Sequence, residues 1–327
     1  MLPNFSYIRP ATLSEAVAQL GAPGARVYAG GTDLIGCLHD RVFDARLVVS
    51  LSRVAELRGV STAPDGALRI GALTTIAEVA AHPVVTGKYA ALAEAAASVA
   101  TPQIRNQATI GGNLCQRPRC WYFRGDFPCV RKGGDLCYAM GGENQLHAIF
   151  GATTCLAVHP SDIATALVAL SARLEIAGRR GVVRSVPVES FFVLPDEDAT
   201  RETVLQSDEI LTGIIVPPPL TGFVSTYRKV RTRGAFDFAL ASLAVGLSFR
   251  GGRVETPRIV LGAAALKPWR SAKAESVLAG ARLDAKTIVR AANAAVDGAA
   301  ALEQNAYKIP MFRGLVQEVL ENLNAPA

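Results

Sequence analysis

A glycine turn followed by most of the protein's cysteines constrains this chain more than any other feature. The turn is Thr109-Ile110-Gly111-Gly112-Asn113. Five of the six cysteines lie between residues 109 and 162: Cys115, Cys120, Cys129, Cys137 and Cys155. Thiols concentrated in this way indicate either a loop folded around a metal or a loop closed by disulfides, and the two imply different compartments.

The N-terminus bears on the compartment. The first six residues, Met-Leu-Pro-Asn-Phe-Ser, lack a charged region followed by an apolar run, and no apolar segment approaches the length that spans a bilayer. We therefore expect a cytoplasmic protein with reduced thiols and no membrane span, which disfavours disulfides. A periplasmic location remains open if the folded chain is exported with a partner that bears the signal.

Composition predicts a globular protein of two or three domains, since 50% of the 327 residues are hydrophobic and 19% are charged. The 34 basic side chains exceed the 28 acidic ones but are scattered. A nucleic-acid-binding protein would show a basic stripe with interleaved aromatic residues, so we expect no nucleic-acid partner.

Cysteine spacing alone favours an iron–sulfur cluster and leaves two alternatives open. Eight, seven and seventeen residues separate the four cysteines from Cys120 to Cys155. Structural zinc sites use short C-x2-C or C-x4-C pairs, whereas a larger cluster tolerates wider gaps, although the ferredoxin spacings are absent. Zinc and unrelated cysteines remain open. The aromatic residues Trp121, Tyr122, Phe123 and Phe127 would shield a cluster from water.

A similar glycine turn, Ala29-Gly30-Gly31-Thr32-Asp33-Leu34, precedes the first by about eighty residues. We interpret the two turns as anion-binding loops that face one ligand, because glycine allows backbone amides to approach closely, and we expect Thr32 to cap the following helix. Neither turn matches the G-x-G-x-x-G or P-loop pattern, so the ligand is not identified by a motif rule.

Alternating strands and helices in three blocks predict an α+β protein, and Pro217-Pro218-Pro219 is the expected domain boundary. Residues 103–107 are expected to form a loop and Ala239–Val245 a helix. Ser161-Asp162 is expected to open another helix.

The chain resembles the FAD-binding subunits of the xanthine dehydrogenase (molybdenum hydroxylase) family over nearly its whole length. Four motifs occur in the family's order: the two glycine-turn segments at 29–34 and 105–114, His159-Pro160-Ser161-Asp162 and Tyr227-Arg228-Lys229-Val230. The segment from Arg119 to His147 resembles an insertion found in periplasmic aldehyde oxidases of the PaoABC type and in 4-hydroxybenzoyl-CoA reductases. In those subunits the insertion holds a [4Fe–4S] cluster.

The resemblance implies a two-part FAD-binding domain of the vanillyl-alcohol-oxidase (PCMH) type, followed by an α+β domain like the C-terminal domain of the CO dehydrogenase flavoprotein. The expected boundaries are 1–60 and 61–217 for the two FAD-binding subdomains and 218–327 for the C-terminal domain. The iron–sulfur insertion would occupy about 115–155.

The resemblance also implies the FAD-binding residues. Both glycine turns would grip the diphosphate through backbone amides, and Asp162 and Lys229 would lie near the flavin, where the lysine charge would stabilise the reduced ring. Without the resemblance, Asp162 would be a helix cap and Lys229 a solvated lysine. The complete set is Ala29, Gly30, Gly31, Thr32, Asp33, Leu34, Arg105, Asn106, Thr109, Gly111, Gly112, Asn113, Asp162, Leu211 and Lys229.

For the cluster, the resemblance implies Cys120, Cys129 and Cys137 as ligands. The fourth is expected to be Cys155, which precedes the His-Pro-Ser-Asp motif as in the aldehyde oxidase branch. Its rival is Cys115, which follows the second glycine turn. The reductase branch has a further cysteine near residue 144, which is absent here.

The function implied is electron transfer within a heterotrimeric, molybdenum-containing aldehyde oxidase or dehydrogenase, with dimerisation of the heterotrimer left open. A large subunit would carry the molybdenum cofactor, a small subunit two [2Fe–2S] clusters, and this chain would pass electrons to an external acceptor, with no catalytic acid or base of its own. One alternative is the FAD subunit of a 4-hydroxybenzoyl-CoA reductase. An alternative of another class is a zinc-stabilised, non-catalytic binding module.

Overall fold

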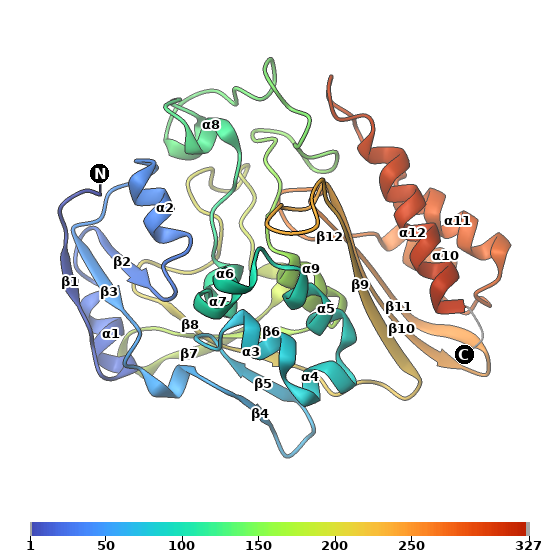
Figure 1. Cartoon of the computed structure of the whole chain (residues 1–327), viewed down its shortest axis with the longest axis horizontal. Coiled ribbons are helices and arrows are strands. Elements are labelled where there is room, and N and C mark those ends of the chain that lie inside the picture. Colours follow the sequence, from blue (N-terminus) through green and yellow to red (C-terminus); the bar gives the residue numbers. More distant parts are fainter. Residues whose placement is uncertain (1, 325–327) are drawn as a thin grey trace. The chain divides into compact units, whose positions relative to one another are not determined.

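A computed structural model describes residues 2–324. The chain is an α+β protein, as predicted, and it divides into two compact units, each built from separated segments (Figure 1). Unit 1 contains the chain up to Val79, Thr101–Leu136 and Ser171–Pro218. Unit 2 contains Ala80–Ala100, Cys137–Leu170 and the chain from Pro219 onward. The predicted boundaries at 60/61 and 217/218 remain predictions.

Unit 1 begins with a three-stranded parallel sheet in the order β1-β3-β2, formed by Ser6–Ile8, Leu47–Ser50 and Ala25–Tyr28. Val48 and Val49 are consecutive in β3 and therefore point to opposite faces. Val49 joins a core with helix α1 (Leu13–Gln19), and Val48 joins a smaller core that includes Leu38 of helix α2 (Leu34–His39). The central strand β3 is thus buried on both faces.

A second sheet of unit 1 has five antiparallel strands in the order β4-β5-β8-β6-β7. Its strands are Val60–Thr62, Leu68–Gly71, Ile210–Val216, Arg173–Ala177 and Val183–Pro187. The remaining elements of this unit are short helices: η1 (Ala55–Leu57), α6 (Pro102–Gln107), α7 (Ile110–Leu114), α8 (Trp121–Arg124), η2 (Val130–Lys132), η3 (Arg179–Gly181) and η4 (Val188–Ser190). Helix α3 (Ile76–Ala81) leads from unit 1 into unit 2.

Unit 2 is built on a four-stranded antiparallel sheet in the order β12-β11-β10-β9. The strands, in that order, are Trp269–Arg270, Arg253–Gly262, Ala241–Arg250 and Phe223–Val230. Its helices are α4 (Pro83–Lys88), α5 (Ala90–Ser98), α9 (Asp162–Ala169), α10 (Ala272–Leu278), α11 (Ala285–Ala295) and α12 (Lys308–Asn324).

Strand β10 contradicts a prediction from the sequence, because Ala239–Val245 was expected to be a helix. Leu243 and Val245 point into a core with α10, α11 and α12. On the opposite face, a Cβ added to Gly246 would lie 3.1 Å from the carbonyl oxygen of Ala169, in α9. A strand covered on both faces shows no alternation of polar and apolar residues, so its small and apolar side chains resemble a buried helix.

Residues 103–107 were also predicted wrongly, as a loop. They belong to α6, whose first residue is Pro102 and whose N-cap, Thr101, accepts a hydrogen bond from the backbone of Ile104. Proline at the first helical position supplies the required φ angle and lacks an N–H that would be unsatisfied there.

Candidate functional site

Close backbone contacts determine the geometry of the first glycine turn, which follows β2. A Cβ added to Gly30 would lie 2.2 Å from the carbonyl oxygen of Gln107. Gly31 has φ +75°, and a Cβ there would meet the ring of Tyr28 at 2.6 Å. Only glycine fits at either position without rearrangement.

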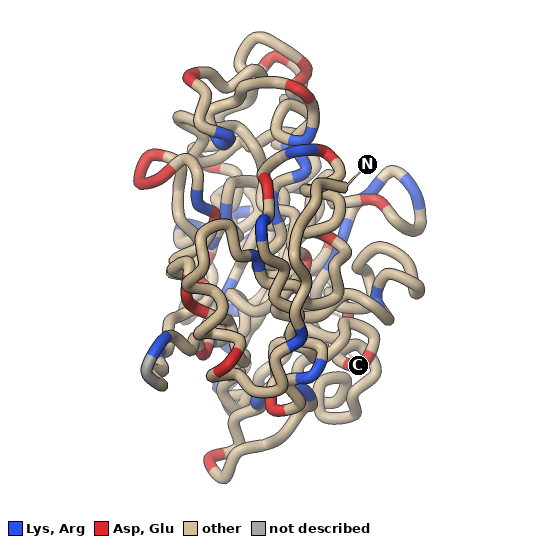
Figure 2. The backbone as a smooth tube through the Cα atoms, turned by 90° about the vertical axis from the view of Figure 1, so that its left-hand side faces the viewer, with Lys and Arg blue, Asp and Glu red and all other residues tan. Residues whose placement is uncertain are grey.

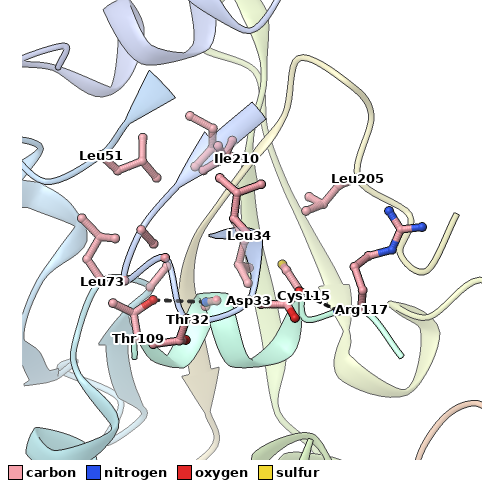
Figure 3. A pocket seen from close by; sticks show the side chains of 18 of the residues that line it. Thr32, Asp33, Leu34, Leu51, Leu73, Thr109, Cys115, Arg117, Leu205 and Ile210 are labelled. Atoms are coloured by element: carbon pink, nitrogen blue, oxygen red, sulfur yellow. Dashed lines mark hydrogen bonds between the residues drawn. The ribbon is translucent and has the colours of Figure 1, made fainter. Parts of the chain in front are cut away.

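The second turn packs against the first. The side-chain amide of Gln107 donates to the carbonyl of Gly30 at 3.1 Å. Thr109 caps α7 by accepting a hydrogen bond from the backbone of Gly112 at 3.2 Å (Figure 3). A Cβ on Gly111 would lie 2.8 Å from that of Ala72. The two turns, about eighty residues apart in sequence, are therefore adjacent in unit 1.

Both turns line one cavity of about 220 Å³ (Figure 3). Much of its remaining wall is apolar and comes from Leu51, Leu73, Leu205, Ile210 and Leu211. Within the described chain, the backbone N–H groups of Gly31 and Thr32 donate to no other residue, so they are available to an anion. The volume is below the 300–1,000 Å³ typical of whole ligand sites, so the cavity suits part of a larger ligand.

Unit 2 contains a buried polar cluster of its own. Lys229, on β9, and Asp162, in the first turn of α9, form an ion pair of 2.7 Å with side chains only 4% and 6% exposed. The hydroxyl of Tyr227 donates to the other carboxylate oxygen at 2.5 Å. Burial, and then the charge of Asp162, raise the pKa of Tyr227 well above its usual value, so the phenol stays protonated.

Comparison with known proteins identifies the family. Residues 3–219 match the FAD binding domain in molybdopterin dehydrogenase, and residues 225–323 match the CO dehydrogenase flavoprotein C-terminal domain. The chain belongs to this family of FAD-binding subunits.

Individual relatives agree with this assignment. The aldehyde oxidoreductase FAD-binding subunit PaoB of Escherichia coli is 34% identical over 99% of both chains. A putative xanthine dehydrogenase FAD-binding subunit of the same organism is 33% identical over 86% of this chain and 82% of its own. A solved structure of carbon monoxide dehydrogenase from Hydrogenophaga pseudoflava aligns with a TM-score of 0.77 at 27% identity, covering 97% of this chain and 96% of the other. The chain is thus a subunit of an oxidoreductase.

The cavity fits an FAD diphosphate. The glycines of the two turns lack side chains that would block a phosphate from approaching the backbone. The apolar wall of the cavity suits the flat rings of a dinucleotide. Of the FAD-binding residues expected from the sequence, ten line this cavity: Ala29, Gly30, Gly31, Thr32, Asp33, Leu34, Thr109, Gly111, Gly112 and Leu211.

Five of the expected residues lie elsewhere. Arg105 and Asn106 lie on α6, and Asn113 lies on α7 outside the cavity lining. Asp162 and Lys229 lie in unit 2 and contact one another. Lys229 is therefore not a solvated lysine.

One helix cap differs from expectation, whereas α9 opens at Ser161-Asp162 as predicted. The N-cap of α2 is Asp33 rather than Thr32, and its side chain makes no capping bond. The N-cap of α9 is Ser161, which accepts from the backbone of Ala164 at 2.9 Å. Asp162 follows that cap, so its carboxylate is engaged by Lys229 and Tyr227 instead.

The cysteines occupy both units. All six are free thiols, which disfavours the disulfide alternative. Cys120 and Cys129 belong to unit 1, where they precede α8 and η2, and Cys137 and Cys155 belong to unit 2. Among residues 2–324, no three His, Cys, Asp or Glu side chains are grouped as a metal site.

Of the aromatic residues that were predicted to shield a cluster, Phe123 is buried, whereas Trp121 and Phe127 are exposed.

Cys137 and Cys155 contact one another within unit 2. A hydrogen bond from Cys155, assisted by the backbone of Leu156, Ala139 and Met140, lowers the pKa of Cys137 to about 6, although burial opposes the shift. Cys115 differs, because it lines the cavity formed by the two glycine turns, where burial and the charge of Asp33 raise its pKa to about 12.

Three residues of the site were missed by the sequence analysis. Tyr227 lies two residues before Lys229 on β9, so strand alternation places both on one face, and this spacing is a signal that could have identified it. Arg117 lines the same cavity as the glycine turns and forms an ion pair with Glu202 at 2.5 Å. No sequence pattern indicated that pair, because its members are 85 positions apart in the sequence.

No helix between residues 2 and 324 combines the length and apolar character that crossing a bilayer requires.

Proposed function

We propose that this chain carries FAD and a [4Fe–4S] cluster and transfers electrons within a molybdenum-containing aldehyde oxidoreductase. One observation carries the proposal: two glycine turns form a diphosphate-sized cavity in a chain that is 34% identical, over its whole length, to an aldehyde oxidoreductase FAD-binding subunit. The family membership favours this interpretation over a zinc-stabilised binding module.

In this proposal the cavity holds the FAD diphosphate and the Asp162–Lys229 pair lies near the flavin. Bound FAD supplies a group that accepts and releases electrons singly or in pairs. The chain's own residues bind and orient the cofactor: the amides of the glycine turns attract its phosphates, and Tyr227 holds the Asp162 carboxylate in one orientation. Arg105, Asn106 and Asn113 then help to order the turns.

The proposed cluster ligands are Cys120, Cys129, Cys137 and Cys155. Their support is the resemblance of the cysteine segment to an insertion found in some members of the family, and the contact between Cys137 and Cys155. Thiolates are the ligands of such clusters, and the lowered pKa of Cys137 favours a thiolate. Cys115 is less suitable as the fourth ligand, since it faces the FAD cavity in surroundings that favour the neutral thiol.

The proposed partners are a large subunit with the molybdenum cofactor and a small subunit with two [2Fe–2S] clusters. This chain would receive electrons from those clusters and deliver them to an external acceptor. The compartment is proposed to be the cytoplasm, or the periplasm if a small subunit carries an export signal. The 34% identity to an aldehyde oxidoreductase subunit supports this proposal over a 4-hydroxybenzoyl-CoA reductase.

The visible spectrum of the protein, purified with its copurifying subunits, tests the cofactor content. Flavin bands with a broad iron–sulfur shoulder are expected, together with four iron atoms per chain beyond those of the small subunit. A preparation that contains zinc but no flavin would overturn the proposal.

Two serine substitutions test the ligand set. Cys155→Ser is expected to lose the cluster's spectrum and most of its iron while FAD remains bound. Cys115→Ser is the matched control and is expected to retain the iron. The reverse pattern would assign the fourth ligand to Cys115.

A further inference from the structure

The carboxylate of Asp33 is turned toward the cysteine segment. It accepts a hydrogen bond from the backbone N–H of Arg117 at 2.9 Å. It also pairs with the guanidinium groups of Arg119 at 2.9 Å and Arg124 at 2.7 Å. These partners lie 84 to 91 residues away in sequence and flank Cys120 on both sides.

Asp33 also belongs to the FAD cavity. It ends the turn Gly30-Gly31-Thr32 and lines the cavity, and Figure 3 shows its side chain beside the backbone of Arg117. A carboxylate close to a diphosphate would repel it. The two arginines neutralise this charge, so the carboxylate serves better as an anchor for the segment than as a ligand of the phosphates.

A second carboxylate anchors the same segment without lining the FAD cavity. Glu202 pairs with Arg117 at 2.5 Å and with Arg131 at 2.8 Å. Arg131 is buried and also donates to the carbonyl of Arg201 at 3.1 Å. Glu202 therefore provides an internal control for Asp33. It is also a carboxylate that pairs with arginines of residues 117–132, but it does not line the cavity.

We propose that Asp33 is a positioning residue that couples FAD binding to the order of residues 117–132, which carry Cys120 and Cys129. An FAD diphosphate that fixes the backbone of the first turn also fixes the carboxylate of Asp33. That carboxylate holds residues 117–132 at three points: the backbone N–H of Arg117 and the guanidinium groups of Arg119 and Arg124. Coupling between two sites is reciprocal, so a cluster held by this segment strengthens FAD binding in return. The inference rests on the proposed FAD and cluster sites.

Hydrogen–deuterium exchange on the purified complex, before and after removal of FAD, tests the coupling. In the wild type, loss of FAD is expected to speed exchange in peptides covering 117–132 about tenfold, within the 5- to 150-fold range usual for coupled sites. Peptides from strand β10 serve as the reference and are expected to be unchanged. We call the ratio of exchange rates without and with FAD the FAD effect. An FAD effect below twofold in peptides covering 117–132 would overturn the inference.

Two variants separate coupling from simple loosening of the segment. Asp33→Asn is expected to exchange rapidly with or without FAD, so the FAD effect falls to less than twofold. Glu202→Gln is expected to exchange faster in both states and to retain the FAD effect. Equal FAD effects in the two variants would overturn the proposed role of Asp33. If Asp33→Asn yields no folded complex, Arg119→Gln removes the anchor from the other side and should reduce the FAD effect.

Iron analysis distinguishes failure of this inference from failure of the proposed function. A wild-type chain that holds FAD but no iron of its own would overturn the cluster, while the exchange experiment would still decide the coupling. A wild-type chain that holds both cofactors without an FAD effect on exchange would overturn only the coupling.

Discussion

The two halves of the cysteine segment are held in chemically different ways. The first half, residues 115–132, is held in unit 1 by ion pairs from its arginines to Asp33 and Glu202. Figure 2 shows how the basic and acidic residues are distributed along the chain. Arginine suits this role because its planar fork pairs with carboxylates in a defined geometry.

The second half, residues 137–156, is held in unit 2 mainly by amide and carbonyl groups. Asn144 and Gln304 exchange two hydrogen bonds between side chain and backbone, at 3.2 and 3.0 Å. The amide of Asn305 donates to the carbonyls of His147 and Ala148 at 3.1 and 3.2 Å.

Lys308, at the start of α12, completes this second anchor. Its ammonium donates to the carbonyls of His147 at 3.0 Å and Ala263 at 2.6 Å, and more weakly to that of Leu146 at 3.4 Å. The residue is 0% exposed, and burial lowers its pKa to about 7. The first half therefore depends on charge pairing, whereas the second depends on satisfied carbonyls and on the protonation state of one lysine.

The largest effect is expected from breaking the ionic anchor at Glu202. Glu202→Ala leaves Arg131, whose side chain is 3% exposed, with an uncompensated charge. Removing one partner of a buried pair costs about 3–5 kcal/mol of unfolding free energy. Urea denaturation measures the loss. The control is Asp297→Ala, which breaks an exposed pair with Lys273 and should cost no more than about 1 kcal/mol.

A smaller loss is expected from breaking the carbonyl anchor. Lys308→Met retains the volume of the side chain but leaves the carbonyl of Ala263 without its donor, at roughly 1–3 kcal/mol, while the carbonyl of His147 keeps its hydrogen bond from Asn305. Denaturation at pH 7 measures the change, with the exposed Lys273→Met as control. A loss equal to that of the control would show that the ammonium contributes nothing to this anchor.

The pH dependence sharpens the contrast. The folded-state pKa of Lys308 is about 7 against 10.5 for an unperturbed lysine, so between these values the unfolded state binds the extra proton and stability rises with pH. His147, which faces the lysine, has a pKa lowered to about 4 by burial and stays neutral in this range. From pH 7 to 9 the wild type should gain stability over Lys308→Met by up to about 1.4 kcal/mol per pH unit.

The smallest expected effect is that of salt. At about 1 M ionic strength the screening length falls to about 3 Å, which weakens partly exposed pairs such as Arg119–Asp33. Hydrogen exchange in 117–132 should rise roughly twofold, because partly buried pairs are screened less than exposed ones. Exchange in 137–150 should not change. Equal sensitivity of the two segments would contradict the contrast between them.

Much of the lining of the candidate site could be predicted from the sequence, because the glycine turns are local features. Gly30, Gly31, Gly111 and Gly112 stand out as turns wherever they occur, and the structure brings both turns to one cavity. The partners of Asp33 could not be predicted, since a carboxylate at the end of a turn can cap its own helix, bind a ligand or pair with a distant arginine. Only long-range packing decides among these.

The sequence by itself determined the α+β class, the two glycine turns, the concentration of cysteines and the resemblance to a flavoprotein family, since each depends on residue type and spacing along the chain. The tertiary structure decided which charges meet. It joined Asp162 to Lys229 and Tyr227, turned Asp33 toward Arg119 and Arg124, and made β10 a strand by covering both of its faces. Burial makes these pairings specific, because a charge removed from water must find a partner, and the fold alone determines which partner is within reach.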